Sequence, residues 1–260
     1  MAAPLAPRVP YLDELAGVSI GAVLALAAAV RRGKAVHPNG VVYAARLVVS
    51  GASQAPPARL LREPSEHRAI VRFSRSLGLP RPLPDLLGLS LRVLDAYGGG
   101  RHQDFLLVTS VDRPLLHHVF VPATDVQQRP YSSSLPYRAG GDRFLVGVLP
   151  DPCSPRPDGH DEFARLDAAA ASGRLSFRLC TAAMGGQFRP VGELRIGRRL
   201  ADELDALRFN PWNTGEDLVP AGWLNGARYR AYQFSQAAWG RTHPDGARRQ
   251  AAAERALAGL

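Results

Sequence analysis

Short strands dominate the first part of this chain, and they constrain its fold more than any other feature of the sequence. Apolar residues alternate with Ser90 and Arg92 over residues 89–94, which is the period of a strand with one buried face. Runs of Val, Leu, Ile and Phe predict further strands over residues 41–49, 69–74, 103–110, 143–149, 174–180 and 191–196. Because strands precede most helices and do not alternate with them, the order predicts an α+β fold. In such a fold, an antiparallel sheet or barrel carries helices at its ends.

Helices are predicted at both ends of the chain, over residues 12–32, 200–207, 226–239 and from 248 onward. Residues 1–10 contain three prolines and are predicted to be a disordered lead, while residues 111–160 are proline-rich and predicted to be irregular. No shift in composition divides the remainder, so residues 11–260 are predicted to form a single domain. The apolar stretch 17–30 is too short to span a bilayer and is interpreted as a buried or amphipathic helix.

The charge of the chain is strongly positive, with a formal net charge of +9 and a single lysine, Lys34. A basic surface attracts nucleic acids, anionic membranes or acidic ligands. The arginines are scattered and no nucleic-acid recognition motif accompanies them, so a nucleic-acid partner is disfavoured. A few arginines could instead bind the carboxylates of an anionic cofactor.

Cysteine usage favours a reducing compartment. The two cysteines, Cys153 and Cys180, form neither a disulfide framework nor a C-x-x-C pair. No signal peptide is evident at the N-terminus, so we predict a cytoplasmic protein without a transmembrane segment.

An arginine precedes a tyrosine by four residues at Arg228 and Tyr232, within the predicted helix 226–239. On a helix the two side chains share a face. A nearby guanidinium favours the phenolate, which otherwise forms only near pH 10. Tyrosinate is the axial haem ligand that distinguishes catalases from other haem proteins. The spacing alone is common in an arginine-rich chain.

Three further segments add to this pair: Val36-His37-x-x-Gly40, Val71-Arg72-Phe73-Ser74 and Phe209-Asn210-Pro211-Trp212. In this order, with Arg228 and Tyr232 following, they resemble the haem catalase superfamily. The chain is most similar to its short, catalase-related (mini-catalase-like) members, which keep the barrel core and lack the peripheral domains. The resemblance runs from about residue 31 to 241 and is poor between about 111 and 175. It implies a closed antiparallel β-barrel of the catalase type and a bound haem b.

The resemblance implies roles for three residues on the distal side. His37 corresponds to the general base that moves a proton between the two peroxide oxygens, for which a histidine is suited. Ser74 corresponds to the serine that orients this histidine, and Arg72 to an arginine that pairs with a haem propionate. Two of them also have a plainer reading: His37 as a surface histidine before a strand, and Arg72 as the outward face of a half-buried strand.

On the proximal side the resemblance implies that Tyr232 ligates the iron and that Arg228 keeps it ionised. Arg241 corresponds to a second arginine that binds a propionate. Phe73 and Phe105 are candidates for packing against the macrocycle, although ordinary core positions suit both.

The chain departs from the family's pattern at two places. Leu87 replaces an arginine, and Thr109 and Ser110 stand where catalases place a distal asparagine. A hydroxyl could donate a hydrogen bond there, with different geometry. We therefore predict a haem peroxidase that reduces hydrogen peroxide or an organic hydroperoxide, uses a small-molecule electron donor and has weak or no catalase activity.

Three alternatives share the fold: an enzyme that transforms lipid hydroperoxides, a non-catalytic haem-binding protein, and a haem-free scaffold. The presence of both His37 and Ser74 favours an enzyme, whereas Leu87 and the missing asparagine keep the scaffold open. His117 and His118 are not predicted to bind one metal, because neighbours on a strand point to opposite faces. The sequence leaves open the peroxide, the donor and whether the chain forms a homo-oligomer.

Overall fold

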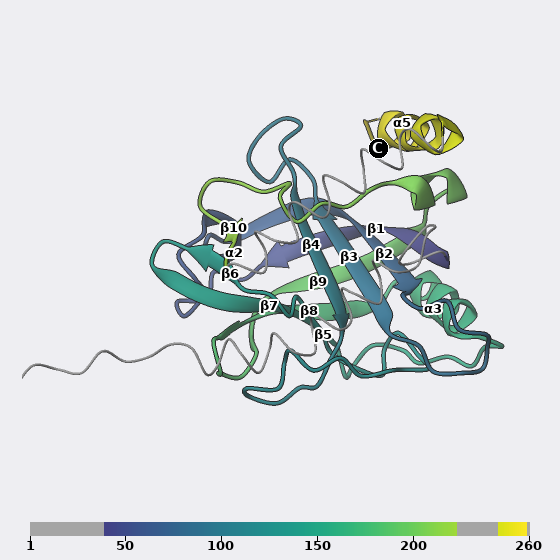
Figure 1. Ribbon diagram of the computed structural model, residues 1–260, viewed down its shortest axis with the longest axis horizontal. Coiled ribbons are helices and arrows are strands. Elements are labelled where there is room, and N and C mark those ends of the chain that lie inside the picture. Colours follow the sequence, from purple (N-terminus) through teal and green to yellow (C-terminus); the bar gives the residue numbers. More distant parts are fainter. Residues whose placement is uncertain (1–38, 223–243, 259–260) are drawn as a thin grey trace, which may run out of the picture. The chain divides into compact units, whose positions relative to one another are not determined.

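The computed structural model describes residues 39–222 and 244–258, and an antiparallel barrel forms its centre (Figure 1). Within the described residues, eight strands close into a ring in the order β7-β5-β4-β3-β2-β1-β9-β8, with β8 pairing back to β7. All pairings are antiparallel. The barrel strands are β1 (Asn39–Val49), β2 (Ser65–Arg75), β3 (Leu87–Val93), β4 (Gln103–Thr109), β5 (Tyr131–Ser132), β7 (Asp142–Pro150), β8 (Ser176–Ala183) and β9 (Arg189–Arg199). The predicted α+β barrel is confirmed.

Short elements complete the described fold. Strands β6 (Tyr137–Ala139) and β10 (Val219–Pro220) extend the sheet beside β7. The helices are α2 (Arg59–Arg62), α3 (Glu162–Ala171), the 3₁₀ helix η1 (Asp202–Ala206) and α5 (Pro244–Ala258). The predicted helix 200–207 is thus a short 3₁₀ turn, the tail helix is confirmed, and α3 was not predicted. None of the described helices is long and apolar enough to cross a membrane.

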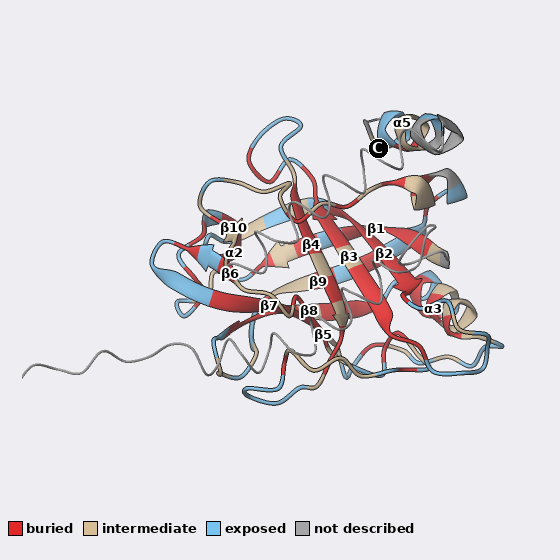
Figure 2. Cartoon of the chain, in the orientation of Figure 1, coloured by how far each residue is buried: buried red, intermediate tan, exposed pale blue. Residues whose placement is uncertain are grey.

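Two apolar cores lie on opposite sides of strands β1 to β4. These strands are coloured mostly as buried in Figure 2. The barrel interior is filled by alternate strand residues, and its largest fully buried side chains include Tyr43, Phe73, Phe105, Tyr131 and Phe177. The outer core lies between the outer face of the same strands and the helices η1 and α5. It is formed by Val42, Ile70, Leu94, Leu200, Leu204, Leu207, Phe209 and Ala253. Strands β1 to β4 therefore present a covered outer face, on which a site could be built.

The close approach of β1 and β9 depends on Gly192. A Cβ at this position would lie 2.6 Å from the carbonyl oxygen of Val48 and 3.3 Å from Cα of Val49, and backbone atoms in a sheet cannot easily move. We expect Gly192→Ala to lower the free energy of unfolding by about 1–3 kcal/mol, the usual cost of overpacking. The matched control is Gly99→Ala in the β3–β4 turn, where a Cβ would meet nothing within 4 Å. Urea unfolding of both variants tests this, and equal effects would contradict the assigned strand contact.

A buried carboxylate links the end of β2 to the start of α3. Glu162 accepts hydrogen bonds from Arg75 at 3.1 Å and from Arg81 at 3.0 Å. Burial of Glu162 opposes its ionisation, but the bonds from Arg81 and Arg75 outweigh burial and lower its pKa below the ordinary value of 4.5. The unfolded chain therefore takes up this proton first as the pH falls.

This shift predicts a pH dependence of stability. The stabilisation from Glu162 should be present above about pH 4.5 and lost as the pH falls through the lower folded-state pKa. Glu162→Gln should be less stable at neutral pH and lose less stability on acidification. Glu193→Gln, at an exposed carboxylate that pairs with Arg195, is the matched control. Urea midpoints measured from pH 7 to 3 decide this, and an unchanged acid slope in Glu162→Gln would refute it.

Candidate functional site

The strand register places one predicted site residue, Ser74, in the middle of a row that crosses four strands. Ser74 lies opposite Gly40 on β1 and Gly88 on β3, and Gly88 lies opposite Val108 on β4. Directly opposed residues point to the same face of a sheet. The next row on this face, two residues along, is Val42, Arg72, Ser90 and Leu106. The outer face at this end therefore has a floor of mainly small side chains.

The hydroxyl of Ser74 is buried in this floor. Its Oγ donates a long hydrogen bond of 3.5 Å to the carbonyl oxygen of Gly88. Strand β1 begins at Asn39, opposite Arg75, so the chain enters the sheet beside Ser74. His37 lies outside the described residues, two positions before this entry. The sheet register is thus compatible with the predicted pairing of Ser74 with His37.

Arg72 lies in the second row as a buried cation, with 8% of its surface exposed. Its Nε donates to Oδ1 of Asp205 at 2.7 Å. Its guanidinium covers Gly40, where a Cβ would lie 2.6 Å from Cζ of Arg72. The position is therefore built to hold a carboxylate next to the floor. A second carboxylate, such as a haem propionate, would have to bind the Nη groups or displace Asp205.

The structure distinguishes Thr109 and Ser110, the two hydroxyls predicted to stand in place of a distal asparagine. Thr109 is on the side of β4 that faces the barrel interior, with Phe105 and Leu107, and its Oγ1 accepts a hydrogen bond from the Leu87 amide at 3.2 Å. Ser110 is the next residue, so its side chain points to the opposite, outer side, as that of Val108 does. The Ser110 Oγ is fully buried and has no hydrogen-bond partner among the described residues. An unpartnered buried hydroxyl is costly, which marks Ser110 as the better candidate to meet a ligand.

Phe73 and Phe105 are not brought to this face. Both are fully buried in the barrel interior, where Phe73 packs edge-on against Tyr43 and Tyr131, and Phe105 against Tyr137. Phe73 follows Arg72 on one strand, so their side chains point to opposite faces. These two phenylalanines are core residues, and they cannot share a ligand surface with Arg72 and Ser74.

The proximal candidates Arg228, Tyr232 and Arg241 also lie outside the described residues. Their proposed roles as ligand, ionising partner and propionate-binding residue stay predictions. Within residues 39–222 and 244–258, no group of three or more His, Cys, Asp or Glu residues could hold a metal ion. His117 and His118 instead contact backbone carbonyls, those of Val111 and Gly186 for His117 and of Ser134 for His118.

A buried ion pair between Arg92 and Asp104 holds the segment 208–213, which precedes Arg228 and Tyr232 in the sequence. This pair was not predicted from the sequence. Asp104 is fully buried and accepts two hydrogen bonds of 2.7 Å from Arg92. Asp104 also accepts the Asn210 amide at 2.8 Å, and Arg92 donates to the Arg208 carbonyl at 2.8 Å. Burial raises the pKa of Asp104, and the bonds and charge of Arg92 oppose that rise. The sequence did contain a signal for this pair, because Arg92 and Asp104 are opposite charges in two consecutive predicted strands.

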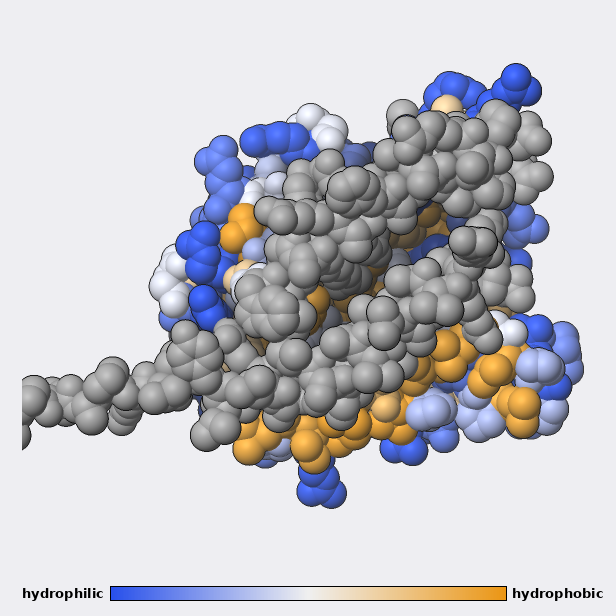
Figure 3. Space-filling model, in the orientation of Figure 1, coloured by the Kyte–Doolittle hydropathy of each residue, from blue (hydrophilic) through white to orange (hydrophobic). Residues whose placement is uncertain are grey.

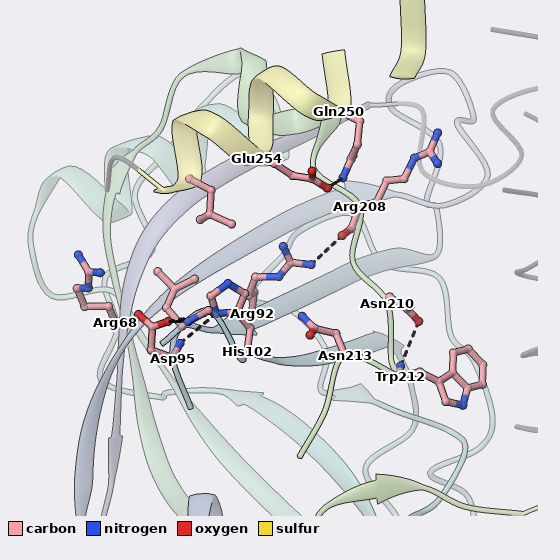
Figure 4. A pocket seen from close by; sticks show the side chains of 13 residues that line it. Arg68, Arg92, Asp95, His102, Arg208, Asn210, Trp212, Asn213, Gln250 and Glu254 are labelled. Atoms are coloured by element: carbon pink, nitrogen blue, oxygen red, sulfur yellow. Dashed lines mark hydrogen bonds and ion pairs between the residues drawn. The ribbon is translucent and has the colours of Figure 1, made fainter. Parts of the chain in front are cut away.

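A cavity of about 830 Å³ lies at the other end of the outer face, beyond this ion pair (Figure 4). In Figure 4, Arg92, Asp95 and His102 come from the barrel side, and Gln250 and Glu254 from α5. Burial and the charge of Arg92 lower the pKa of His102, whose Nδ1 accepts the Asp95 amide at 3.0 Å. Of the predicted site residues within 39–222 and 244–258, none lines this cavity. It is therefore separate from the floor around Ser74.

Comparisons with known proteins agree with this architecture. No family model and no curated protein matches the sequence. Among solved structures, a fungal catalase is 12% identical, with 85% of this chain and 63% of that chain covered and a TM-score of 0.56. Catalase A from Saccharomyces cerevisiae is 10% identical, with coverage of 84% and 62% and a TM-score of 0.55. A bacterial catalase is 12% identical, with coverage of 85% and 59% and a TM-score of 0.50.

This chain therefore spans about three fifths of the length of these catalases. At such low identity the likeness concerns the fold and not the chemistry. The register, the barrel closure and these comparisons together show that the chain has the β-barrel fold of the catalases.

Proposed function

We propose that this protein is a haem-dependent enzyme that reduces hydrogen peroxide or an organic hydroperoxide with electrons from a small organic donor. The observation that supports this most strongly is the row Gly40, Ser74, Gly88 and Val108 on the outer face of a catalase-type barrel. The row lies where β1 begins, two residues after His37. A general base and its orienting hydroxyl would thus meet beside a flat floor.

The described residues fit a planar, anionic cofactor. Gly88, Ser74 and Ser90 present small side chains on this face, while the Arg72 guanidinium covers Gly40. Arg72 is a buried cation that holds the Asp205 carboxylate, and a propionate would take the place of that carboxylate. Tyr232 would hold the iron through its phenolate oxygen, Arg228 would favour that phenolate, and Arg241 would be a second propionate partner. Bound there, haem b supplies the redox-active iron at which the peroxide oxygen–oxygen bond is reduced.

The residues of this chain would handle the protons. His37 takes a proton from one peroxide oxygen and returns it to the other, and Ser74 holds its imidazole in position. The unpartnered Ser110 Oγ can donate a hydrogen bond to the bound peroxide. Overall, two electrons and two protons from the donor convert the hydroperoxide to an alcohol and water. Without the distal asparagine, oxidation of a second peroxide should be weak, and so should oxygen release.

Haem-supplied protein tests this proposal directly. Hydrogen peroxide or cumene hydroperoxide should be consumed in step with oxidation of an aromatic donor, and oxygen release should be slow. Oxygen release as fast as that of a full-length catalase would overturn the peroxidase assignment. Failure of the haem-loaded protein to consume any peroxide would favour a haem carrier, and failure to load haem would favour a scaffold.

The same residues would serve a lipid hydroperoxide, which such a site could reduce, dehydrate or rearrange. Product analysis separates these outcomes, because reduction gives the alcohol and consumes the donor, whereas dehydration and rearrangement consume none. The distribution of exposed apolar side chains bears on this substrate class.

A further inference from the structure

Exposed apolar side chains are concentrated on a few loops. Every large hydrophobic side chain that is exposed in the described residues lies on one of three connections. Leu77 and Leu83 lie on the loop 76–86 between β2 and β3, Leu115 and Leu116 on the finger 111–119 after β4, and Met184 on the β8–β9 turn. Exposed apolar groups gathered in this way usually mark an interaction surface.

The loop 76–86 presents its leucines from an ordered frame. The buried carboxylate of Asp85 accepts the amides of Leu77 at 2.9 Å and Leu79 at 3.0 Å. Arg75 donates to the carbonyls of Leu79 and Leu83. Because the buried Asp85 and Arg75 side chains bind the loop backbone, the loop is fixed in a conformation that exposes Leu77 and Leu83.

The finger 111–119 is anchored in the same manner. The buried His117 contacts the carbonyls of Val111 and Gly186 and packs against Phe188, with ring centroids 4.1 Å apart. Leu115 is 67% exposed and has a left-handed φ of +67°, which is unfavourable for leucine. A strained backbone that projects an apolar side chain into solvent suggests a functional requirement at that position.

The finger and the loop 76–86 lie at one end of the β2–β3–β4 sheet, and the loop is joined to the segment 120–123 that follows the finger. The amides and carbonyls of Asp85 and Ala123 pair with each other, and Ser110 bridges to Phe120. The finger in turn reaches the β8–β9 turn, where Leu115 lies against Gly185, next to Met184. Figure 3 shows apolar side chains gathered along the lower edge of the view, where Figure 1 shows loops below β5 and β8.

Unpaired cations accompany these leucines. Arg113 on the finger and Arg129 at its base are exposed and make no ion pair with any described residue. The whole chain carries a formal charge of +9. Leucines that enter the interface and arginines that meet headgroups are the combination that binds anionic bilayers. We propose that the finger and the loop 76–86 dock the protein on an anionic lipid surface.

The docked orientation would bring the candidate site close to lipid. The loop 76–86 connects Arg75 to Leu87, and the loop that carries the finger starts at Ser110, so both leave from the row that contains Ser74 and Gly88. If the proposed function holds, hydroperoxides of membrane lipids are the substrate class that this orientation favours. The docking itself does not depend on haem and can fail or succeed independently of it.

Co-sedimentation of the full chain with lipid vesicles tests the docking. We expect binding to vesicles of phosphatidylcholine with about one third phosphatidylglycerol, and much weaker binding to phosphatidylcholine alone. Leu115→Asn combined with Leu116→Ser should weaken binding at least tenfold, while Asn relieves the left-handed strain and preserves folding. Arg113→Gln should weaken binding about fivefold and Arg198→Gln, at an exposed arginine on β9, should not.

Three results would overturn the docking proposal. The first is failure to bind the anionic vesicles. The second is binding that the leucine double variant leaves unchanged, which would indicate adsorption through overall charge alone. The third is a concentration-dependent dimer that the double variant dissociates, which would show that a second copy of the chain covers these leucines. Thermal unfolding of the variant should match that of the parent or occur at a higher temperature.

Discussion

Asp104→Ala should lower the free energy of unfolding by about 3–5 kcal/mol, which is a large part of the stability of an ordinary domain. The substitution removes the partner of Arg92, whose guanidinium is buried, and leaves that charge without its two 2.7 Å bonds. It also removes the acceptor of the Asn210 amide. The segment 208–213 should then separate from β4. Chemical unfolding followed by circular dichroism measures the loss.

Two controls define this result. Asp202→Ala removes an exposed partner of Arg199 and should cost less than about 1 kcal/mol. Combining Asp104→Leu with Arg92→Met replaces the pair by apolar groups and should recover much of the stability lost in Asp104→Ala. A cost below 1 kcal/mol for Asp104→Ala would show that the pair does not anchor the segment.

His37→Ala should slow the reaction with hydrogen peroxide by about 10²- to 10⁴-fold, the range expected for loss of a general base. The haem content should be unchanged, because the proposed iron ligand is Tyr232 and not His37. Stopped-flow absorbance of haem-loaded protein after mixing with peroxide gives this rate.

The matched control for His37→Ala is His160→Ala, at a histidine whose side chain is 85% exposed. This variant should react at the parent rate. A rate for His37→Ala within threefold of the parent would assign proton transfer to another group, and the proposed distal arrangement would then be wrong.

Most of the barrel could be predicted because its longer strands carry a local pattern. The alternation over residues 89–94 and the apolar run over 103–110 mark β3 and β4 within two residues of their observed ends. Strands β5, β6 and β10, with two or three residues each, are too short to have a period. Helix α3 was missed although Asp161 caps it, accepting the amides of Phe163 and Ala164.

The candidate site was predicted less completely, because it depends on which strands are neighbours. Strand periodicity alone places Arg72 and Ser74 on the opposite face of the sheet from Phe73, and Ser110 on the opposite face from Thr109. It needs only the face of one residue on each strand to be known. It cannot show that Arg92 and Asp104 oppose each other, since that requires the β3–β4 register. The proximal residues rest on the resemblance to haem catalases, which assigns roles at Arg228 and Tyr232 that no described contact tests.

The absorption spectrum of the protein expressed with abundant haem tests the central proposal most directly, through Tyr232. The parent should show the Soret band of a high-spin ferric haem, and Tyr232→Phe should lose or strongly shift it. Tyr229→Phe, three residues earlier in the same segment, should leave the spectrum unchanged. Absence of a Soret band in the parent, or an unaltered band in Tyr232→Phe, would contradict haem ligation by Tyr232.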